Sequence, residues 1–125
     1  MNNTTPLIPL YTSRGDAEAF LRYPYLFNRL GEWIGWVTAE REVYSVLGLY
    51  VGYLSDDRRI LRKRIIESPP PGRTPPAPPP KIYPPATVPL APLMKELEFG
   101  LVDVLLEEPE RLHTIDIGEL KQDMD

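Results

Sequence analysis

Aliphatic, aromatic and glycine positions recur along the first half of the chain at a spacing of 16 to 17 residues. Three stretches, 10–21, 26–37 and 43–54, align without gaps. Each begins with an aliphatic–aromatic pair, continues through a short turn, and ends in an arm rich in aromatic and β-branched residues. The turn glycines are Gly15, Gly31 and Gly48. A type I turn followed by a bulge needs a residue with positive φ, which glycine adopts at little cost, so the pattern predicts three β-hairpins.

The second arm of each hairpin carries two further recurring positions. A small residue stands in the middle of the arm, and an aromatic residue follows it: Ala19, Gly35 and Gly52, then Phe20, Trp36 and Tyr53. A small residue inside a strand indicates a close approach of another backbone. We expect the aromatic residues to pack in the core, with a ring of exposed aromatic side chains as the alternative.

A fourth hairpin is visible only in part. Adding 17 to Val43 leads to Ile60-Leu61, but Ile65 stands where the turn glycine is expected. The fourth unit is therefore predicted to be a degenerate hairpin or a single strand. One hypothesis is that Leu7-Ile8 pairs with it and closes the ring, because closure removes exposed strand edges. The predicted fold class is a small, pseudo-symmetric all-β domain.

This repeat resembles the four-fold β-flower domain of bacterial proteins. The resemblance covers roughly residues 8–66 and lies in the aromatic residue before each turn, the turn glycine, and the small–aromatic–aliphatic order of the return strand. It implies a compact all-β domain with pseudo-four-fold symmetry. It supplies no catalytic residue, and the missing fourth glycine departs from the family pattern.

Prolines occupy 12 of the 24 positions from 69 to 92. Proline fixes φ and lacks an N–H donor, so this stretch favours polyproline II and is predicted to be a semi-rigid spacer. Two alternatives stay open. The prolines at 75–79 are typical of a ligand for an aromatic-lined groove, and the apolar residues 88–92 are suited to lie on the β-domain.

The last 33 residues form an acidic tail with a helical stripe of apolar residues: Leu93, Leu97, Leu101, Val104 and Leu105. This spacing predicts a short amphipathic helix within 101–108, ending near Pro109. The predicted organisation is an N-terminal segment (1–7), a hairpin domain (8–68), a proline-rich linker (69–92) and a tail (93–125).

Charge is distributed unevenly along the chain. The net charge of −4 is the sum of +1 over residues 1–68, +2 over 69–92 and −7 over 93–125. Five of the 14 Lys and Arg residues form a basic cluster, at Arg58, Arg59, Arg62, Lys63 and Arg64. This cluster has three interpretations: a charged edge strand, a grip on nucleic-acid phosphates, or a receptor for the acidic tail.

The sequence offers little catalytic chemistry. There is no cysteine, and His113 is the only histidine. A single histidine without cysteines does not complete a metal site or a catalytic triad. We therefore expect no metal, no cofactor and no enzymatic activity. No apolar run reaches the length of a membrane span, and no signal peptide is recognised. We therefore expect a cytoplasmic protein without a membrane partner.

The function predicted from the sequence is a non-enzymatic protein–protein interaction or assembly module. Its apolar stripe from Leu93 to Leu105 would dock on a partner or on another copy of the chain. Trp33, Trp36, Tyr50 and Tyr53 would add an aromatic surface if they are exposed. The alternative is a nucleic-acid-binding β-domain that uses the basic cluster at 58–64.

Overall fold

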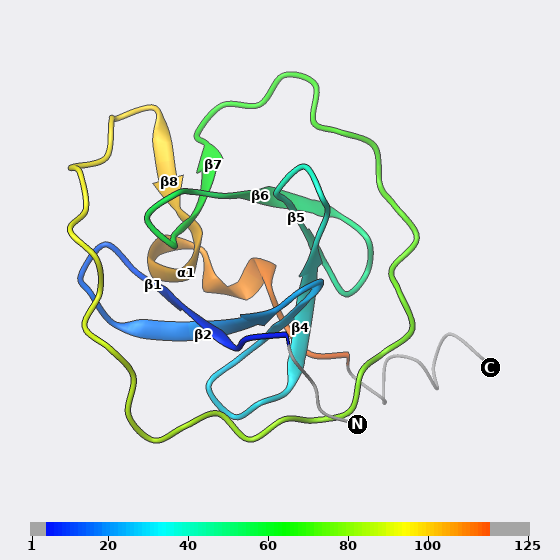
Figure 1. Ribbon diagram of the computed structural model, residues 1–125. Coiled ribbons are helices and arrows are strands. Elements are labelled where there is room, and N and C mark those ends of the chain that lie inside the picture. Colours follow the sequence, from blue (N-terminus) through cyan, green and yellow to red (C-terminus); the bar gives the residue numbers. More distant parts are fainter. Residues whose placement is uncertain (1–4, 116–125) are drawn as a thin grey trace.

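A computed structural model describes residues 5–115 as one curled antiparallel sheet with almost no helix (Figure 1). The eight strands pair in sequence order. They are β1 (Ile8–Tyr11), β2 (Ala17–Arg22), β3 (Tyr25–Phe27), β4 (Trp33–Val37), β5 (Glu42–Ser45), β6 (Tyr50–Leu54), β7 (Ile60–Lys63) and β8 (Leu101–Asp103). The predicted all-β fold class is confirmed.

The three predicted hairpins are β1–β2, β3–β4 and β5–β6. Their turn glycines have φ of 90°, 83° and 82°. A register shift stands just before each turn, at Tyr11, Phe27 and Tyr44. This is the bulge that the aromatic–glycine spacing predicts. The small residues of the second arm also have the predicted role, because a Cβ on Gly52 would lie less than 3.0 Å from the Leu61 carbonyl oxygen of the neighbouring strand.

The fourth hairpin is complete, but its turn is very long. β7 pairs with β8, and residues 64–100 connect the two strands. A turn glycine at position 65 is therefore not needed. The hypothesis that Leu7-Ile8 closes the ring on β7 is wrong, since Ile8 pairs with Leu21 and the neighbours of β7 are β6 and β8.

The segment predicted to be a separate tail belongs in part to the β-domain. Residues 101–103 form β8, so only the later part of the predicted 101–108 helix exists, as α1 (Val104–Glu107). The Asp103 side chain caps this helix by accepting a hydrogen bond from Leu106 N. A 3-10 turn, η1 (Pro109–Arg111), follows. Strand pairing with β7 outweighs the helical periodicity at these positions.

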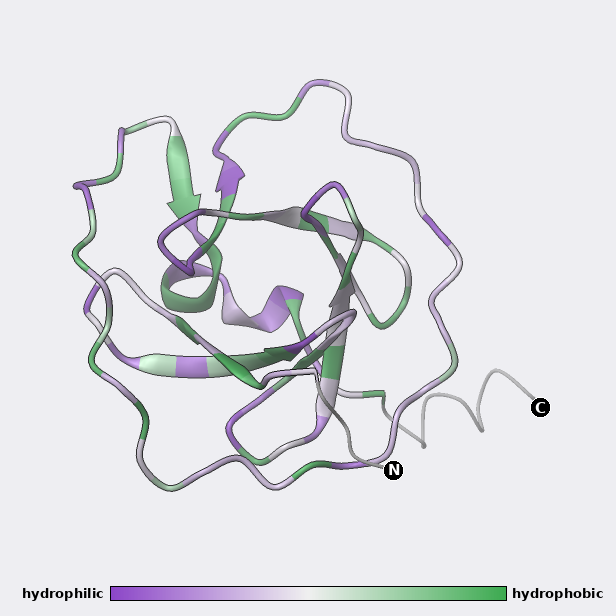
Figure 2. Ribbon diagram, in the orientation of Figure 1, coloured by the Kyte–Doolittle hydropathy of each residue, from purple (hydrophilic) through white to green (hydrophobic). Residues whose placement is uncertain are grey.

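The inside of the curl holds an aliphatic core. α1 and η1 lie within the curl of the strands (Figure 1), and hydrophobic positions occur along α1 and several of the strands around it (Figure 2). The core joins residues of the hairpins to Val104, Leu105 and Leu112 from the C-terminal segment. The hairpins alone would leave the apolar side chains inside the curl exposed. The C-terminal segment, which we call the C-terminal plug, covers them and adds the apolar burial that a domain of about 60 residues lacks.

Four aromatic side chains and one valine make a second cluster, which we call the aromatic cluster: Phe27, Trp33, Trp36, Tyr44 and Val46. Tyr25, Tyr50 and Ile82 pack against it. Trp36 stacks on Tyr44 with ring centroids 5.0 Å apart. Because Ile82 comes from the proline-rich segment, the aromatic cluster lies on the side of the sheet that this segment covers.

Residues 69–92 form an extended strip without regular secondary structure, which we call the proline belt. It runs around the outside of the hairpins and returns to β8 (Figure 1). The prediction of a spacer between two units is not met, because both ends of the belt join the same hairpin and its residues lie on the domain. The alternative that residues 88–92 dock on the β-domain is confirmed, since Tyr11 donates a hydrogen bond to the Pro89 carbonyl at 2.7 Å.

Candidate functional site at the proline belt

The proline belt docks on the glycine turns through its backbone. Arg73 N donates to the Gly48 carbonyl at 2.9 Å, and Ile82 N donates to the Gly31 carbonyl at 3.0 Å. The two anchors are 9 residues apart in the belt and 17 apart in the hairpins. Nine residues of the belt therefore span the distance between two successive hairpin turns.

The two anchored segments of the belt also repeat in sequence. They are Arg73-Thr74-Pro75-Pro76-Ala77 and Ile82-Tyr83-Pro84-Pro85-Ala86. A Cβ on Gly48 would meet Pro75 Cδ at 3.4 Å, and one on Gly31 would meet Pro84 Cδ at 3.1 Å. The same belt unit is thus seated in the same way on two successive turns. This nine-residue repeat is the sequence signal of belt docking, and it lies outside the hairpin repeat.

The turn glycines have a second role besides positive φ. A Cβ on Gly31 or Gly48 would lie less than 3.0 Å from a belt carbonyl oxygen. Arg41 and Arg58 also adopt positive φ, at 68° and 66°, in turns of the same hydrogen-bond pattern, without a glycine. Arginine bears the strain of this conformation there. Glycine at 31 and 48 is therefore required by the close approach of the belt as well as by the turn.

Side chains add to the backbone anchors. Tyr25 donates to the Ala77 carbonyl at 3.0 Å. Arg73 lies 5.6 Å from the Tyr44 ring centroid and 3.4 Å from a Glu42 oxygen. Burial, and then the negative charge of Glu42, raise the pKa of Tyr50 beside this group. The hydroxyl therefore stays protonated at neutral pH.

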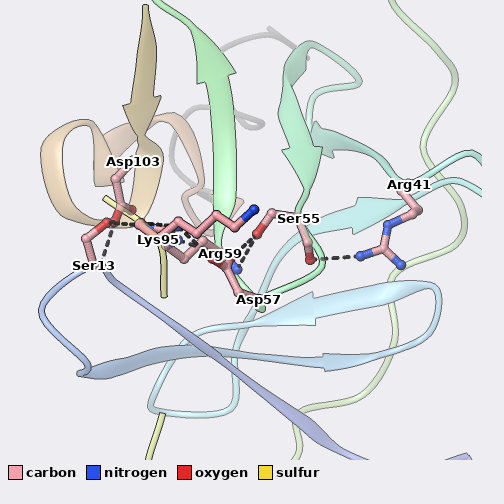
Figure 3. Close-up of polar contacts among 7 residues, drawn as sticks. All are labelled: Ser13, Arg41, Ser55, Asp57, Arg59, Lys95 and Asp103. Atoms are coloured by element: carbon pink, nitrogen blue, oxygen red, sulfur yellow. Dashed lines mark hydrogen bonds and ion pairs between the residues drawn. The ribbon is translucent and has the colours of Figure 1, made fainter. Parts of the chain in front are cut away.

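A polar network closes the ring between the first and fourth hairpins (Figure 3). Its centre is Arg59, which is only 3% exposed. The guanidinium donates to Asp57 at 2.6 Å, to Ser13 Oγ at 2.8 Å and to the Lys95 carbonyl at 3.0 Å. Ser13 N and Oγ both donate to Asp103 at 2.6 Å. Four separate segments of the chain thus meet around one buried cation.

Asp57 has a perturbed acidity in this network. Burial by itself would raise the pKa of Asp57, but hydrogen bonds from Arg59 and Ser55 and the charge of Arg59 outweigh it and hold the pKa below the ordinary value. The carboxylate is thus kept ionised as the counter-charge of a buried guanidinium.

The predicted apolar stripe is not a single surface. Val104 and Leu105 are buried in the aliphatic core, while Leu93 is fully exposed. Leu101 lies in β8, and Leu97 is half-buried. The stripe was inferred from helical spacing, but residues 93–100 form no helix and Leu101–Asp103 is a strand, so its members face different environments. It therefore cannot dock as the helix face that the sequence predicted.

The predicted basic cluster is also divided. Arg59 is buried, and Arg62 pairs with Glu108 at 3.4 Å. Arg64 donates to the Phe99 and Leu101 carbonyls at the tip of the β7–β8 hairpin. Two members, Arg58 and Lys63, have exposed side chains with no ion pair within residues 5–115. Sequence spacing brings five cations together, whereas the sheet sends them to different neighbours.

The candidate aromatic surface is not exposed. Trp33 and Trp36 are buried, and Tyr50 and Tyr53 are half-buried. This agrees with the expectation that the Phe20, Trp36 and Tyr53 positions serve packing. The most exposed large apolar residues lie instead on the belt and the segment after it, at Tyr83, Leu90, Leu93 and Phe99. Other large apolar residues, in or next to the hairpins, are exposed to a smaller extent: Tyr23, Leu30, Leu47, Leu49 and Ile65.

Comparisons with known proteins give no relative. No family model, curated protein or solved structure matches the chain. The resemblance to the four-fold β-flower family therefore stays a prediction. Among the described residues, no cluster of three or more His, Asp or Glu is placed to hold a metal. No helix within residues 5–115 has the length and apolar character to cross a membrane.

Proposed function

We propose that this protein is a non-enzymatic interaction module that presents the outer face of the proline belt to a partner protein. The partner class that fits this surface is a domain with an aromatic-lined groove that binds polyproline II segments. The observation that carries the proposal is the belt itself: an extended proline-rich strip held against the domain, with Tyr83 85% and Leu90 95% exposed.

Anchoring favours such a role on energetic grounds. A polyproline II segment has three residues per turn, so docking one side leaves the other sides facing outward. The anchors at Gly31 and Gly48 hold the strip extended before a partner arrives. Ordering a flexible segment on binding costs free energy, and a segment that is already ordered avoids much of that cost.

The docking surface proposed here differs from the one expected from the sequence. Of the apolar stripe, Leu93 alone is both fully exposed and continuous with the belt. The contact residues we propose are therefore Tyr83, Leu90 and Leu93. Self-association through this face would be an assembly role of the same kind.

The test is a titration of the full-length protein against a panel of Src-homology 3 and WW domains. We expect at least one domain to bind with micromolar affinity, and the triple variant Tyr83→Ala, Leu90→Ala, Leu93→Ala to bind at least tenfold more weakly. A synthetic 69–94 peptide serves as the control for ordering and should bind more weakly than the full-length protein. Absence of binding across the panel, or equal binding by the triple variant, would refute this surface. Light scattering of the free protein reports any self-association.

Nucleic-acid binding is the second candidate, and two exposed cations favour it. Arg58 and Lys63 have no ion pair among the described residues. The double variant Arg58→Glu, Lys63→Glu leaves the buried Arg59 intact and isolates this role. A gel shift with single-stranded and double-stranded DNA that is lost in the double variant would support the candidate. No shift at low salt would exclude it.

We further infer that the domain is a member of the four-fold β-flower family and that it acts in the cytoplasm. The hairpin repeat of 16 to 17 residues, with a fourth hairpin interrupted by the belt, supports the family proposal. A solved β-flower structure that lacks four sequential hairpins would count against it.

A further inference from the structure

The first hairpin departs from the aromatic pattern of the other two. In β3–β4, Phe27 pairs with Trp33, and in β5–β6, Tyr44 pairs with Tyr50. The same register in β1–β2 pairs Tyr11 with Ala17. One large ring is therefore missing from the side of β2 that faces the proline belt.

A cavity occupies the place of that ring. It has a volume of about 660 Å³ and lies between β2 and the belt residues 84–88. Its lining is Asp16, Ala17, Glu18, Phe20, Arg29, Pro84, Pro85, Ala86 and Val88. Cavities of 300–1,000 Å³ are typical of small-molecule sites.

The equivalent space between the second hairpin and the turn of the third is filled, because the aromatic residues are present there. There Trp33 and Trp36 are buried in the aromatic cluster together with Val46. In the repeat alignment, Trp33 corresponds to Ala17 and Val46 corresponds to Arg29. The cavity therefore arises from two replacements: a large ring by a methyl group, and an aliphatic side chain by a cation.

The polar groups that line the cavity are not used within the domain. Asp16, Glu18 and Arg29 make no ion pair within residues 5–115. Apolar walls face them, from the buried Phe20 ring and from the prolines of the belt. The site thus combines room for a flat ring with two carboxylates and one guanidinium.

We propose that this cavity binds an aromatic amino acid. The ring takes the space that Trp33 fills in the second hairpin, between the Phe20 side and the belt prolines. The ligand ammonium faces Asp16 and Glu18, and its carboxylate faces Arg29, which suits bidentate recognition. This inference goes beyond the proposed function, because its residues line the space between β2 and the belt, whereas Tyr83, Leu90 and Leu93 are exposed to solvent and do not line it.

The binding test uses saturation-transfer and 15N-shift NMR on the full-length protein with L-tryptophan, L-tyrosine and L-phenylalanine. We expect saturable binding of at least one of them below 1 mM, with shifts at residues 16–20 and 84–88. Tryptamine, which lacks the carboxylate, should bind at least fivefold more weakly. A Trp-Gly-Gly peptide that binds more tightly than free tryptophan would identify the source of the ring as a peptide N-terminus. No saturable shift with any of these ligands would overturn the proposal.

Two variants separate the site from general folding. Ala17→Trp restores the missing ring, so it should abolish binding while raising the melting temperature. Arg29→Val copies the third hairpin and should remove the preference for tryptophan over tryptamine. Ligand binding unchanged in both variants would refute the site. Should Ala17→Trp fold poorly, the double variant Asp16→Asn, Glu18→Gln provides the test through loss of ammonium binding. Binding to the panel of Src-homology 3 and WW domains should be unchanged by Ala17→Trp. Failure of the ligand site and failure of the partner surface can therefore be told apart.

Discussion

Tyr11 and Tyr44 stand at the same place in the first and third hairpins, yet their hydroxyl groups have different surroundings. The Tyr11 hydroxyl donates to the Pro89 carbonyl at 2.7 Å. The Tyr44 hydroxyl is buried and has no hydrogen-bond partner among residues 5–115. The second hairpin carries Phe27 at this position and needs no partner. The same position of the repeat thus carries a hydrogen-bonded hydroxyl, an unsatisfied buried hydroxyl and no hydroxyl in the three hairpins.

We predict opposite effects when each hydroxyl is removed. Tyr11→Phe leaves a belt carbonyl without its donor and should lower the free energy of unfolding by about 1 kcal/mol. Tyr44→Phe removes an unsatisfied buried group and should leave stability unchanged or raise it by up to about 1 kcal/mol. Urea unfolding of both variants measures the difference. Equal destabilisation by the two changes would contradict this interpretation.

The turn residues mark how far sequence reasoning reaches at this scale. Positive φ at Gly15, Gly31 and Gly48 could be predicted from the aromatic–glycine spacing. Positive φ at Arg41 could not, because arginine has no preference for that conformation. The burial of Arg59 was also missed, since a cation in a basic run is ordinarily exposed. The turns at 38–42 and 55–59 share the hydrogen-bond pattern of the glycine turns, and this likeness was the one signal for positive φ at Arg41 and Arg58.

At the scale of elements, glycine substitutions should separate turn strain from belt docking. Ala at position 15, 31 or 48 costs about 1–2 kcal/mol for the left-handed backbone alone. At Gly15 the nearest belt atom would be 3.9 Å away, which is ordinary contact. At Gly31 and Gly48 the belt must move away. We therefore expect Gly31→Ala and Gly48→Ala to release the belt, and Gly15→Ala to leave it in place.

Trypsin provides the measurement, because the belt carries a cleavage site at each anchor. Lys81 precedes the anchor residue Ile82, and Arg73 is itself an anchor. Cleavage after Lys81 should accelerate at least tenfold in Gly31→Ala, and cleavage after Arg73 should accelerate similarly in Gly48→Ala. Mass spectrometry identifies the products. If Gly15→Ala accelerated both cleavages equally, this would contradict the prediction that each turn glycine holds only the belt segment docked on it.

Removing the belt should leave the sheet and expose the aromatic cluster. Arg64 N donates to the Gly100 carbonyl, so the ends of the long connection are already paired. Replacing residues 66–98 with Asn-Gly should give an ordinary short hairpin. We expect a β-rich circular dichroism spectrum together with strong binding of a hydrophobic dye. A variant that fails to bind the dye would mean that the belt covers little of the cluster.

The elements that could be predicted are those with local signals. Three hairpins follow from periodic aromatic and glycine positions, and α1 follows from its apolar spacing and Pro109. β8 could not be predicted, because it is three residues long and depends on its distant partner β7. The belt was interpreted as a spacer because prolines form no regular hydrogen-bond pattern, whereas its docking depends on occasional donors such as Arg73 N and Ile82 N.

On the scale of the whole molecule, the Arg59 network should make stability sensitive to acid. The Asp57 pKa is lower in the folded state than in the unfolded chain. Its contribution is therefore complete above the unfolded pKa, near 4, and is lost as the pH falls through the folded value. Asp57→Asn should lower the free energy of unfolding by about 2–3 kcal/mol at pH 7, since it leaves a buried cation without its counter-charge.

The difference between wild type and Asp57→Asn should shrink when urea unfolding is repeated at pH 3. Asp56→Asn is the matched control, because the Asp56 side chain is fully exposed and lies 3.7 Å from Arg41. An exposed pair of this kind contributes little, so the control should stay close to wild type at both pH values. A gap between wild type and Asp57→Asn that is the same at pH 7 and pH 3 would contradict the role of Asp57.

The cavity between β2 and the belt was the least predictable part of the molecule. It is defined by Ala17, an ordinary residue in isolation, and it is recognised only when Ala17 is compared with Trp33 and the belt is placed opposite it. The sequence alignment contained the substitution, but not the fact that a distant segment forms the opposite wall.

The long connection of the fourth hairpin also determines the order in which the fold can assemble. The first three hairpins close over turns of a few residues, whereas β7 meets β8 only after residues 64–100 have been looped back. Some three doublings of loop length add about 2 kcal/mol of closure entropy. The sheet should therefore nucleate from its N-terminal half during synthesis. The C-terminal plug would arrive last and act as the slow, committing step of folding.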